Sequence, residues 1–172
     1  TAVRMGRLTL NPMSHLDPIG SLALIFMGFG WAKPVPVDTR YLKNPRKDMV
    51  KVAAAGPISN IILAIIGALV LRLLFGTDLL SNSVKTFFII FMQINITLAV
   101  FNLLPVPPLD GSQILAPFIE KQFGPDIVWK MQVYGPRVLF IIIIFSMVTD
   151  IHIFSFIITP IFNLFILIFF NF

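Results

Sequence analysis

The chain has 172 residues, of which 57% are hydrophobic and only 12% are charged, and its mean hydropathy is +0.91. A soluble domain carries about a quarter charged residues, so this composition indicates an integral membrane protein. The chain contains no cysteine, which excludes disulfides, thiolate catalysis and cysteine-bound zinc. The predicted fold class is an all-α polytopic membrane protein with about 3–4 transmembrane helices, a re-entrant or interfacial helix and a short N-terminal β-strand.

The net charge of +5 is concentrated at one end of the sequence. Eight cations precede residue 52, namely Arg4, Arg7, Lys33, Arg40, Lys43, Arg46, Lys47 and Lys51. Basic segments that flank apolar ones stay on the cytoplasmic side, so we place the basic loop 32–51 on that side of the cell membrane. Nucleic-acid binding is the rival interpretation. We disfavour it because the aromatic residues lie in lipid-type runs and form no stacking platform.

Residues 1–51 form the first predicted region. Residues 3–10 alternate bulky with small or polar side chains and end at an Asn-Pro pair, which predicts a short β-strand closed by a turn. Asp17 stands before a proline and marks a helix start. The apolar stretch 19–28 after it is too short to span a bilayer, so we expect a re-entrant or interfacial segment.

Residues 52–115 are predicted to form the membrane core. The twenty uncharged residues 52–71 form a first span, a polar turn follows, and the uncharged run 86–104 crosses back. The prolines directly after this run remove backbone donors and end the helix. Asp110 therefore returns to the side of the basic loop.

The last region, residues 116–172, is predicted to contain a connecting loop and C-terminal hydrophobic helices. Residues 116–136 have mixed polarity, and we expect them to form the loop. The apolar stretches 138–148 and 151–170 are separated by a Thr-Asp pair, and Pro160 weakens the second. The tail accommodates one full span plus a partial one, and the sequence leaves their boundary open.

A first motif lies in the predicted helix 52–71. Small residues recur there at helical spacing, which lets another helix pack closely. They are Gly56, Asn60, Ala64 and Gly67. A packing helix kinked by a proline explains the glycines well, but an amide inside a membrane needs a hydrogen-bond partner. A packing role and a functional role for Asn60 therefore both stay open.

A second motif is one face of the returning helix, where Asn95 and Asn102 are seven residues apart and share a side. Two amides in register either bond neighbouring helices, which is the commoner case, or grip an extended peptide backbone. Asn102 lies just ahead of the proline break and is the better functional candidate of the two.

Asp110 is the most informative residue, because it places a lone carboxylate at the end of a lipid-soluble helix. In hydrocarbon, an ionised carboxylate is tolerated only where protein, water or a cation satisfies it. Asp110 is therefore a candidate for metal binding or catalysis, and the alternative is a helix cap for residues 112–118. His15 and Asp17 form a second metal-ligand hypothesis. In the alternative interpretation, Asp17 caps a helix and His15 forms a local hydrogen bond.

Four segments in a fixed order, residues 6–20, 30–37, 55–60 and 102–111, carry a family resemblance. The last three read GWAKPVPV, AGPISN and NLLPVPPLDG. Together the four segments resemble the site-2 protease family of intramembrane zinc metalloproteases. The likeness is closest to the bacterial branch without an inserted PDZ domain, and it covers roughly residues 1–115.

The resemblance implies a Zn²⁺ cofactor and hydrolysis of a peptide bond within the membrane plane. In that family, two histidines of an H-E-x-x-H helix and the aspartate of the L-D-G motif hold zinc, so Asp110 is the implied third ligand. Asn60, Asn102 and Pro107 match positions expected to line the site or hold substrate. The implied partners are membrane proteins with transmembrane helices, in the lipid bilayer of a bacterial inner membrane. A substrate helix has to unwind locally, and the predicted strand 3–10 offers it an edge for β-addition.

No H-E-x-x-H occurs in the 172 residues, so the family's general-base glutamate is not in this chain. We expect that the chain starts after the catalytic helix, and that these residues alone are inactive and bind zinc weakly or not at all. The alternative is an inactive pseudoprotease or membrane scaffold that binds transmembrane helices through the stripe from Gly56 to Asn60. A transporter fragment ranks last, because no inverted repeat is visible.

Overall fold

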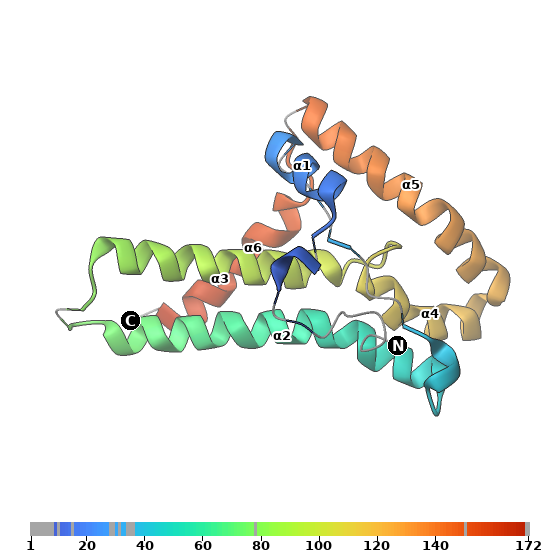
Figure 1. Cartoon of the computed structure of the whole chain (residues 1–172), viewed down its shortest axis with the longest axis horizontal. Helices are drawn as coiled ribbons and strands as arrows, with labels where there is room; N and C mark the ends of the chain where they lie inside the picture. The colour runs from blue at the N-terminus through green and yellow to red at the C-terminus, as the bar shows by residue number, and fades with distance from the viewer. Residues whose placement is uncertain are drawn as a thin grey trace. The chain divides into compact units, whose positions relative to one another are not determined.

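The computed structural model describes residues 9, 11–14, 16–27, 30, 32–33, 37–77, 79–149 and 151–170, and these are largely helical (Figure 1). The α-helices are α1 (Pro18–Met27), α2 (Pro45–Leu74), α3 (Asn82–Asn102), α4 (Asp110–Phe123), α5 (Pro125–Thr149) and α6 (Ser155–Phe170), with 3-10 turns at Pro12–Ser14 and Thr39–Tyr41. Within these residues there is no β-strand, and α2, α3 and α5 are long and apolar enough to cross a membrane. The all-α class predicted for a membrane protein is thereby confirmed.

The chain divides into two compact units, residues 1–45 and 46–172. The first contains α1, which starts where the sequence predicts. The N–H of Gly20 donates to Asp17 Oδ1 at 2.8 Å, and the N–H of Ser21 donates to the Asp17 carbonyl at 2.8 Å. Asp17 therefore caps α1. The ten residues of this helix extend only about 15 Å, too little to cross a bilayer.

Two predictions for the first unit lie outside the described residues. One is the β-strand over residues 3–10, of which only Thr9 is described, and the other is the environment of His15. Within the described part of this unit, an isolated antiparallel bridge joins Leu16 and Ala32.

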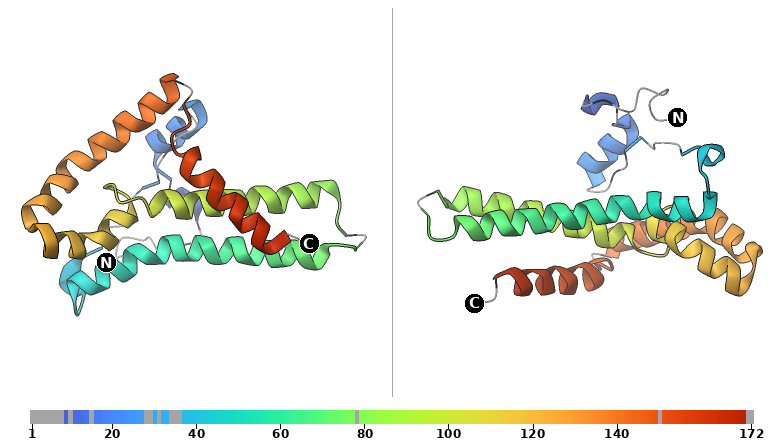
Figure 2. Two further views of the ribbon diagram at one scale, coloured as in Figure 1. Left: turned by 180° about the vertical axis from the view of Figure 1, so that it is seen from behind. Right: turned by 90° about the horizontal axis from the view of Figure 1, so that it is seen from below.

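The second unit contains α2 and α3, which lie side by side in Figures 1 and 2. Their shared core consists of Ala68, Leu71 and Met92, and phenylalanines of α6 pack against it. Gly67 of α2 leaves room for the Phe91 ring of α3, because a Cβ at this position would lie 2.9 Å from that ring.

Both helices begin earlier than their apolar runs predict. α2 starts at Pro45 rather than at residue 52, with proline at its first position and Asp48 in its first turn. α3 starts at Asn82 rather than at residue 86, because Ser81 Oγ accepts a backbone N–H of the first turn and caps the helix. Hydropathy thus marks the lipid-soluble part of each helix and not its ends.

The segment that follows α3 differs from the prediction. α3 ends at Asn102, as the prolines after it predict, but the expected connecting loop 116–136 is helical and belongs to α4 and α5. Gly124 alone separates these helices, with a φ of +84° that favours glycine, and Pro125 begins α5. A single Gly-Pro step therefore turns the chain, and the prolines inside α4 and α5 do not end either helix.

The hydrophobic tail forms the last part of α5 and the shorter α6, with a break after Thr149 as predicted. Just before α6, the Phe154 ring packs edge-on against Phe101 of α3, with 5.2 Å between the ring centroids. At the other end of α6, Arg72 of α2 donates through Nη1 to the Phe169 carbonyl at 3.1 Å. The sixteen residues of α6 are thus held at both ends against the α2–α3 pair (Figure 2).

Candidate functional site

Asp110 is the first residue of α4. Leu109 occupies the N-cap position with an extended backbone (φ −69°, ψ 153°) and no side-chain capping bond. The interpretation of Asp110 as a helix cap for residues 112–118 is therefore wrong, because the helix already includes Asp110. Within the described residues, its carboxylate accepts no hydrogen bond and forms no ion pair.

The loop that carries Asp110 is closed by its own hydrogen bonds. The N–H of Leu109 donates to the Val106 carbonyl at 3.0 Å. The Leu109 carbonyl accepts the N–H of Ser112 at 3.1 Å and the Ser112 hydroxyl at 2.7 Å. Leu109 and Ser112 are buried, and so is Pro107. These bonds and this burial hold the loop as a fixed unit.

Gly111 lets this loop lie directly against the end of α3. A Cβ at Gly111 would overlap the Leu103 carbonyl and would lie 2.6 Å from the Leu104 oxygen. A backbone carbonyl at a helix end cannot rotate away as a side chain does, so only glycine fits here. The contact fixes Asp110 beside the end of the helix that carries Asn102.

On its other side, the Asp110 carboxylate lies against α2. A Cβ on Gly56 would come within 3.2 Å of Asp110 Oδ2, so the glycine leaves space that a larger residue would fill. Asn60 stands one turn further along the same face of α2. The fold therefore brings the AGPISN and LDG motifs of the sequence into one region.

The three asparagines of this part of the chain differ in their hydrogen bonding. Asn95 is 7% exposed, and its Nδ2 donates to the Phe91 carbonyl at 2.8 Å within the same helix. Asn60 and Asn102 are half-buried, and neither side-chain amide is hydrogen-bonded to the described part of the chain. Asn60 and Asn102 are therefore the amides that remain available to another molecule.

Burial raises the pKa of Asp110 above the ordinary value of an aspartate. The residue lies outside the three helices that are long enough to span a membrane. The ion pairs described in its unit, Arg46–Glu120 and Lys51–Asp48, use other carboxylates. A half-buried carboxylate without a hydrogen bond or counter-charge attracts either a proton or a cation.

Asp110 fits a zinc site in its chemistry, but one residue does not complete the site. A carboxylate oxygen is an ordinary zinc ligand, and this one makes no competing bond to the described part of the chain. Catalytic zinc takes three protein ligands, whereas no cluster of three His, Cys, Asp or Glu side chains occurs among the described residues. A zinc site at Asp110 would therefore need its other ligands from outside the described residues.

Comparison with known proteins places these motifs in a family. The profile of Peptidase family M50 matches residues 72–146, a range that contains Asp110. YwhC of Bacillus subtilis is 43% identical over 171 residues, which cover 95% of this chain and 74% of that protein. The chain belongs to peptidase family M50. The resemblance to site-2 proteases is thereby confirmed.

Other relatives of this M50 chain share shorter stretches. Rip2 of Mycobacterium tuberculosis is 35% identical over 127 residues, which cover 70% of this chain and 47% of that protein. MJ0611 of Methanocaldococcus jannaschii is 41% identical over 83 residues, which cover 47% of this chain and 41% of that protein. All three relatives carry the name "Putative zinc metalloprotease". No solved structure matches the chain.

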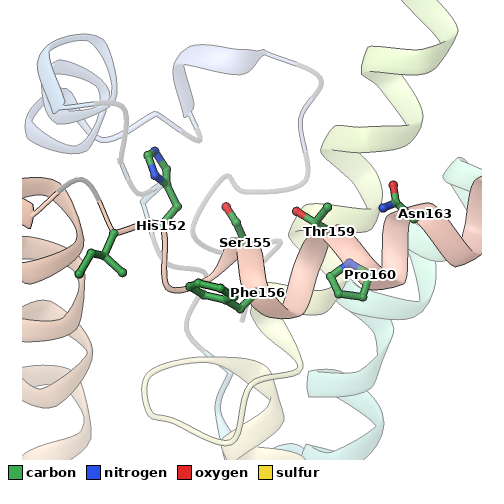
Figure 3. A pocket seen from close by; sticks show the side chains of 7 residues that line it. His152, Ser155, Phe156, Thr159, Pro160 and Asn163 are labelled. Atoms are coloured by element: carbon green, nitrogen blue, oxygen red, sulfur yellow. The ribbon is translucent and has the colours of Figure 1, made fainter.

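A wide groove of the M50 chain lies along α6, away from these motifs (Figure 3). It has a volume of about 730 Å³. Figure 3 shows the polar side chains of His152, Ser155, Thr159 and Asn163 on one side of the helix. No residue that lines this groove belongs to the Asp110 loop or to the AGPISN motif, so we do not assign it to the site.

Sequence reasoning missed two residues that shape the loop before Asp110. Ser112 bonds the Leu109 carbonyl through its hydroxyl, and Gly135 of α5 approaches the Pro107 ring. Their sequence signals are a serine after L-D-G and a Gly-Pro pair in an apolar run. Both signals are common in loops, so neither predicts a role at the site.

Proposed function

We propose that this M50 chain is part of an intramembrane zinc metalloendopeptidase that cleaves transmembrane segments of membrane proteins, with Asp110 as one zinc ligand. One observation carries the proposal: a half-buried carboxylate, with no hydrogen bond or counter-charge among the residues that the structure describes, is held beside Gly56 by a fixed loop. The zinc metalloprotease names of the relatives support the same activity.

The other zinc ligands in this proposal are two histidines of an H-E-x-x-H helix outside these 172 residues, and its glutamate is the general base. When bound, zinc supplies a Lewis acid that lowers the pKa of a water molecule to about 7. Asp110 supplies a negative charge held in one place, and Gly56 keeps the space beside it open. Asn60 and Asn102 offer amides that hydrogen-bond an unwound substrate backbone, and Pro107 gives the loop its shape.

We also propose that Asp110 and the basic loop 32–51 lie on the cytoplasmic side of a bacterial inner membrane, which the chain crosses several times. The argument is the excess of basic residues before the first apolar run. The ion pair between Arg46 Nη2 and Glu120 Oε1, at 2.6 Å, joins the charged start of α2 to α4, the helix that begins with Asp110.

The zinc-ligand role is tested in the full-length protein by metal analysis and by cleavage of a single-span substrate in vesicles. Asp110→Asn keeps the size of the side chain but removes its charge. We expect bound zinc to fall from about one per chain to a small fraction, and cleavage to fall more than about 100-fold.

Asp126→Asn is the matched control, because Asp126 also lies in the first turn of a helix but is exposed. We expect this variant to keep its zinc and its activity. Unchanged zinc content and cleavage in Asp110→Asn would remove the ligand assignment and the proposal with it.

An inactive scaffold that binds transmembrane helices is the second candidate. The observation that favours it is that the 172 residues contain no H-E-x-x-H motif. A scaffold would bind a substrate helix equally well with Asp110→Asn, and would lose that binding with Asn60→Leu. The sequence of the complete reading frame separates the two candidates, because only the peptidase requires an H-E-x-x-H helix.

A further inference from the structure

Gly135, in the middle of α5, lies against the loop that leads to Asp110. A Cβ at Gly135 would lie 2.7 Å from Pro107 Cδ, 2.9 Å from Pro107 Cβ and 3.0 Å from Pro107 Cγ. Carbon atoms in contact are normally about 3.5–4.0 Å apart. The backbone of α5 therefore rests on the proline ring itself, and Gly135 is the residue that permits this.

The loop connects this contact to Asp110 through a short series of bonds. Pro107 is buried and follows Val106, whose carbonyl accepts the N–H of Leu109. Leu109 directly precedes Asp110, and its carbonyl is held by Ser112. These bonds leave the loop little freedom. A displacement of Pro107 is therefore passed on to Asp110.

On the opposite side of the carboxylate, the free space is only about that of one methyl group. Gly56 of α2 already approaches Asp110 Oδ2, and Gly111 is in contact with the end of α3. Glycines therefore border the loop on three sides, and only the one on α5 lies outside the AGPISN and NLLPVPPLDG motifs.

We infer that Gly135 is a positioning residue that sets the place of the Asp110 carboxylate through Pro107; the inference rests on the proposed zinc-ligand role of Asp110. Gly135→Ala requires α5 and Pro107 to separate by about 0.8 Å to restore a normal carbon contact. Distances between a metal and its ligands tolerate only about 0.2 Å. A quarter of this separation, passed on to Asp110, already reaches that tolerance, so we expect weaker zinc binding and not only altered packing.

The test measures zinc affinity in the full-length protein by competition with a chelator, a readout that does not depend on turnover. We expect Gly135→Ala to weaken zinc binding on the order of tenfold. Gly67→Ala is the matched control, because its Cβ would also clash with a neighbour, the Phe91 ring at 2.9 Å. Gly67 is eleven residues from Gly56, about 16 Å along α2, so this variant perturbs packing away from Asp110.

A double-mutant cycle tests the path through Pro107. Pro107→Ala removes the ring atoms Cγ and Cδ, including the atom nearest to the added Cβ. We expect Gly135→Ala to weaken zinc binding less in the Pro107→Ala background than in the natural protein. If Gly135→Ala fails to fold, Met131→Ala replaces it, because Met131 lines the space beside Pro107 and its truncation loosens the same support.

The outcomes separate this inference from the proposed function. Loss of affinity in Gly135→Ala but not in Gly67→Ala, with coupling to Pro107, supports the positioning role. Equal losses in the two glycine variants, or the same loss with and without Pro107→Ala, overturn it. Zinc binding that responds to neither Gly135→Ala nor Asp110→Asn instead overturns the proposed function.

Discussion

The two ends of the α2–α3 pair use glycine in different ways. At the end distant from Asp110, Gly67 faces the ring of Phe91, next to the core of Ala68, Leu71 and Met92. At the Asp110 end, Gly111 faces a backbone carbonyl. A ring can turn or shift when a methyl group is added, whereas a carbonyl at a helix end cannot. Packing is therefore adjustable at one end and fixed at the other, and the proposed ligand lies at the fixed end.

Gly111→Ala is expected to have the largest effect. The added methyl group overlaps the Leu103 carbonyl, so the first turn of α4 has to leave the end of α3. We expect a loss of at least about 3 kcal/mol in the free energy of unfolding, together with loss of zinc binding. Denaturant titration in mixed micelles measures the first and chelator competition the second. If Gly111→Ala were as stable as Gly67→Ala, the packing at the two ends of the α2–α3 pair would be equally adjustable.

Met92→Ala is expected to come next, and to affect stability without affecting zinc. Met92 is fully buried between the helices, and its truncation leaves a cavity among Ala68, Leu71 and the phenylalanines of α6. We expect a loss of about 2–3 kcal/mol in the same unfolding measurement. Met147→Ala, at a position that is 39% exposed, is the control. A fall in zinc affinity with Met92→Ala would contradict the separation of the two ends.

Gly67→Ala is expected to lower the free energy of unfolding by only about 1 kcal/mol, because the half-buried Phe91 ring can shift to accept the methyl group. Replacing the ring as well, in Phe91→Leu, should reduce this cost. The comparison of Gly67→Ala in the two backgrounds measures how far the ring adjusts. If the cost stays the same, the ring is not the group that yields.

Arg46→Gln is expected to have the smallest effect. We expect it to change the free energy of unfolding by no more than about 0.5 kcal/mol. The Arg46 side chain is 76% exposed, so water and salt screen its ion pair with Glu120 although the contact is short. The difference from the natural protein should vanish at high salt. A loss of more than about 1 kcal/mol in the free energy of unfolding that does not depend on salt would be typical of a buried ion pair. It would mean that the Arg46–Glu120 pair fixes α4 on α2.

Local sequence signals predicted several element ends correctly. Asp17 before proline marks the start of α1, and the prolines after Leu104 mark the end of α3 near Asn102. These signals succeed because a capping carboxylate and a missing N–H act within one helical turn. Hydropathy likewise identified the apolar parts of α2 and α3.

Residues 116–136 were predicted incorrectly as a loop, because their mixed polarity is typical of one, whereas they are helical. A proline inside a helix removes one backbone hydrogen bond, and neighbouring helices can offset that loss. The sequence does not show which helices are neighbours. The same limit applies to the site. The family resemblance indicated Asp110, Asn60 and Asn102, but the contacts of Gly56 with Asp110 and of Gly135 with Pro107 depend on how helices pack.

The contact of Gly111 with the end of α3 has a consequence for how relatives are sorted into active and inactive enzymes. Steric fit alone is enough to preserve this glycine, even in a descendant that has lost its metal and its chemistry. A retained glycine at this position therefore reports an intact scaffold, and only the acid before it bears on the proposed zinc site.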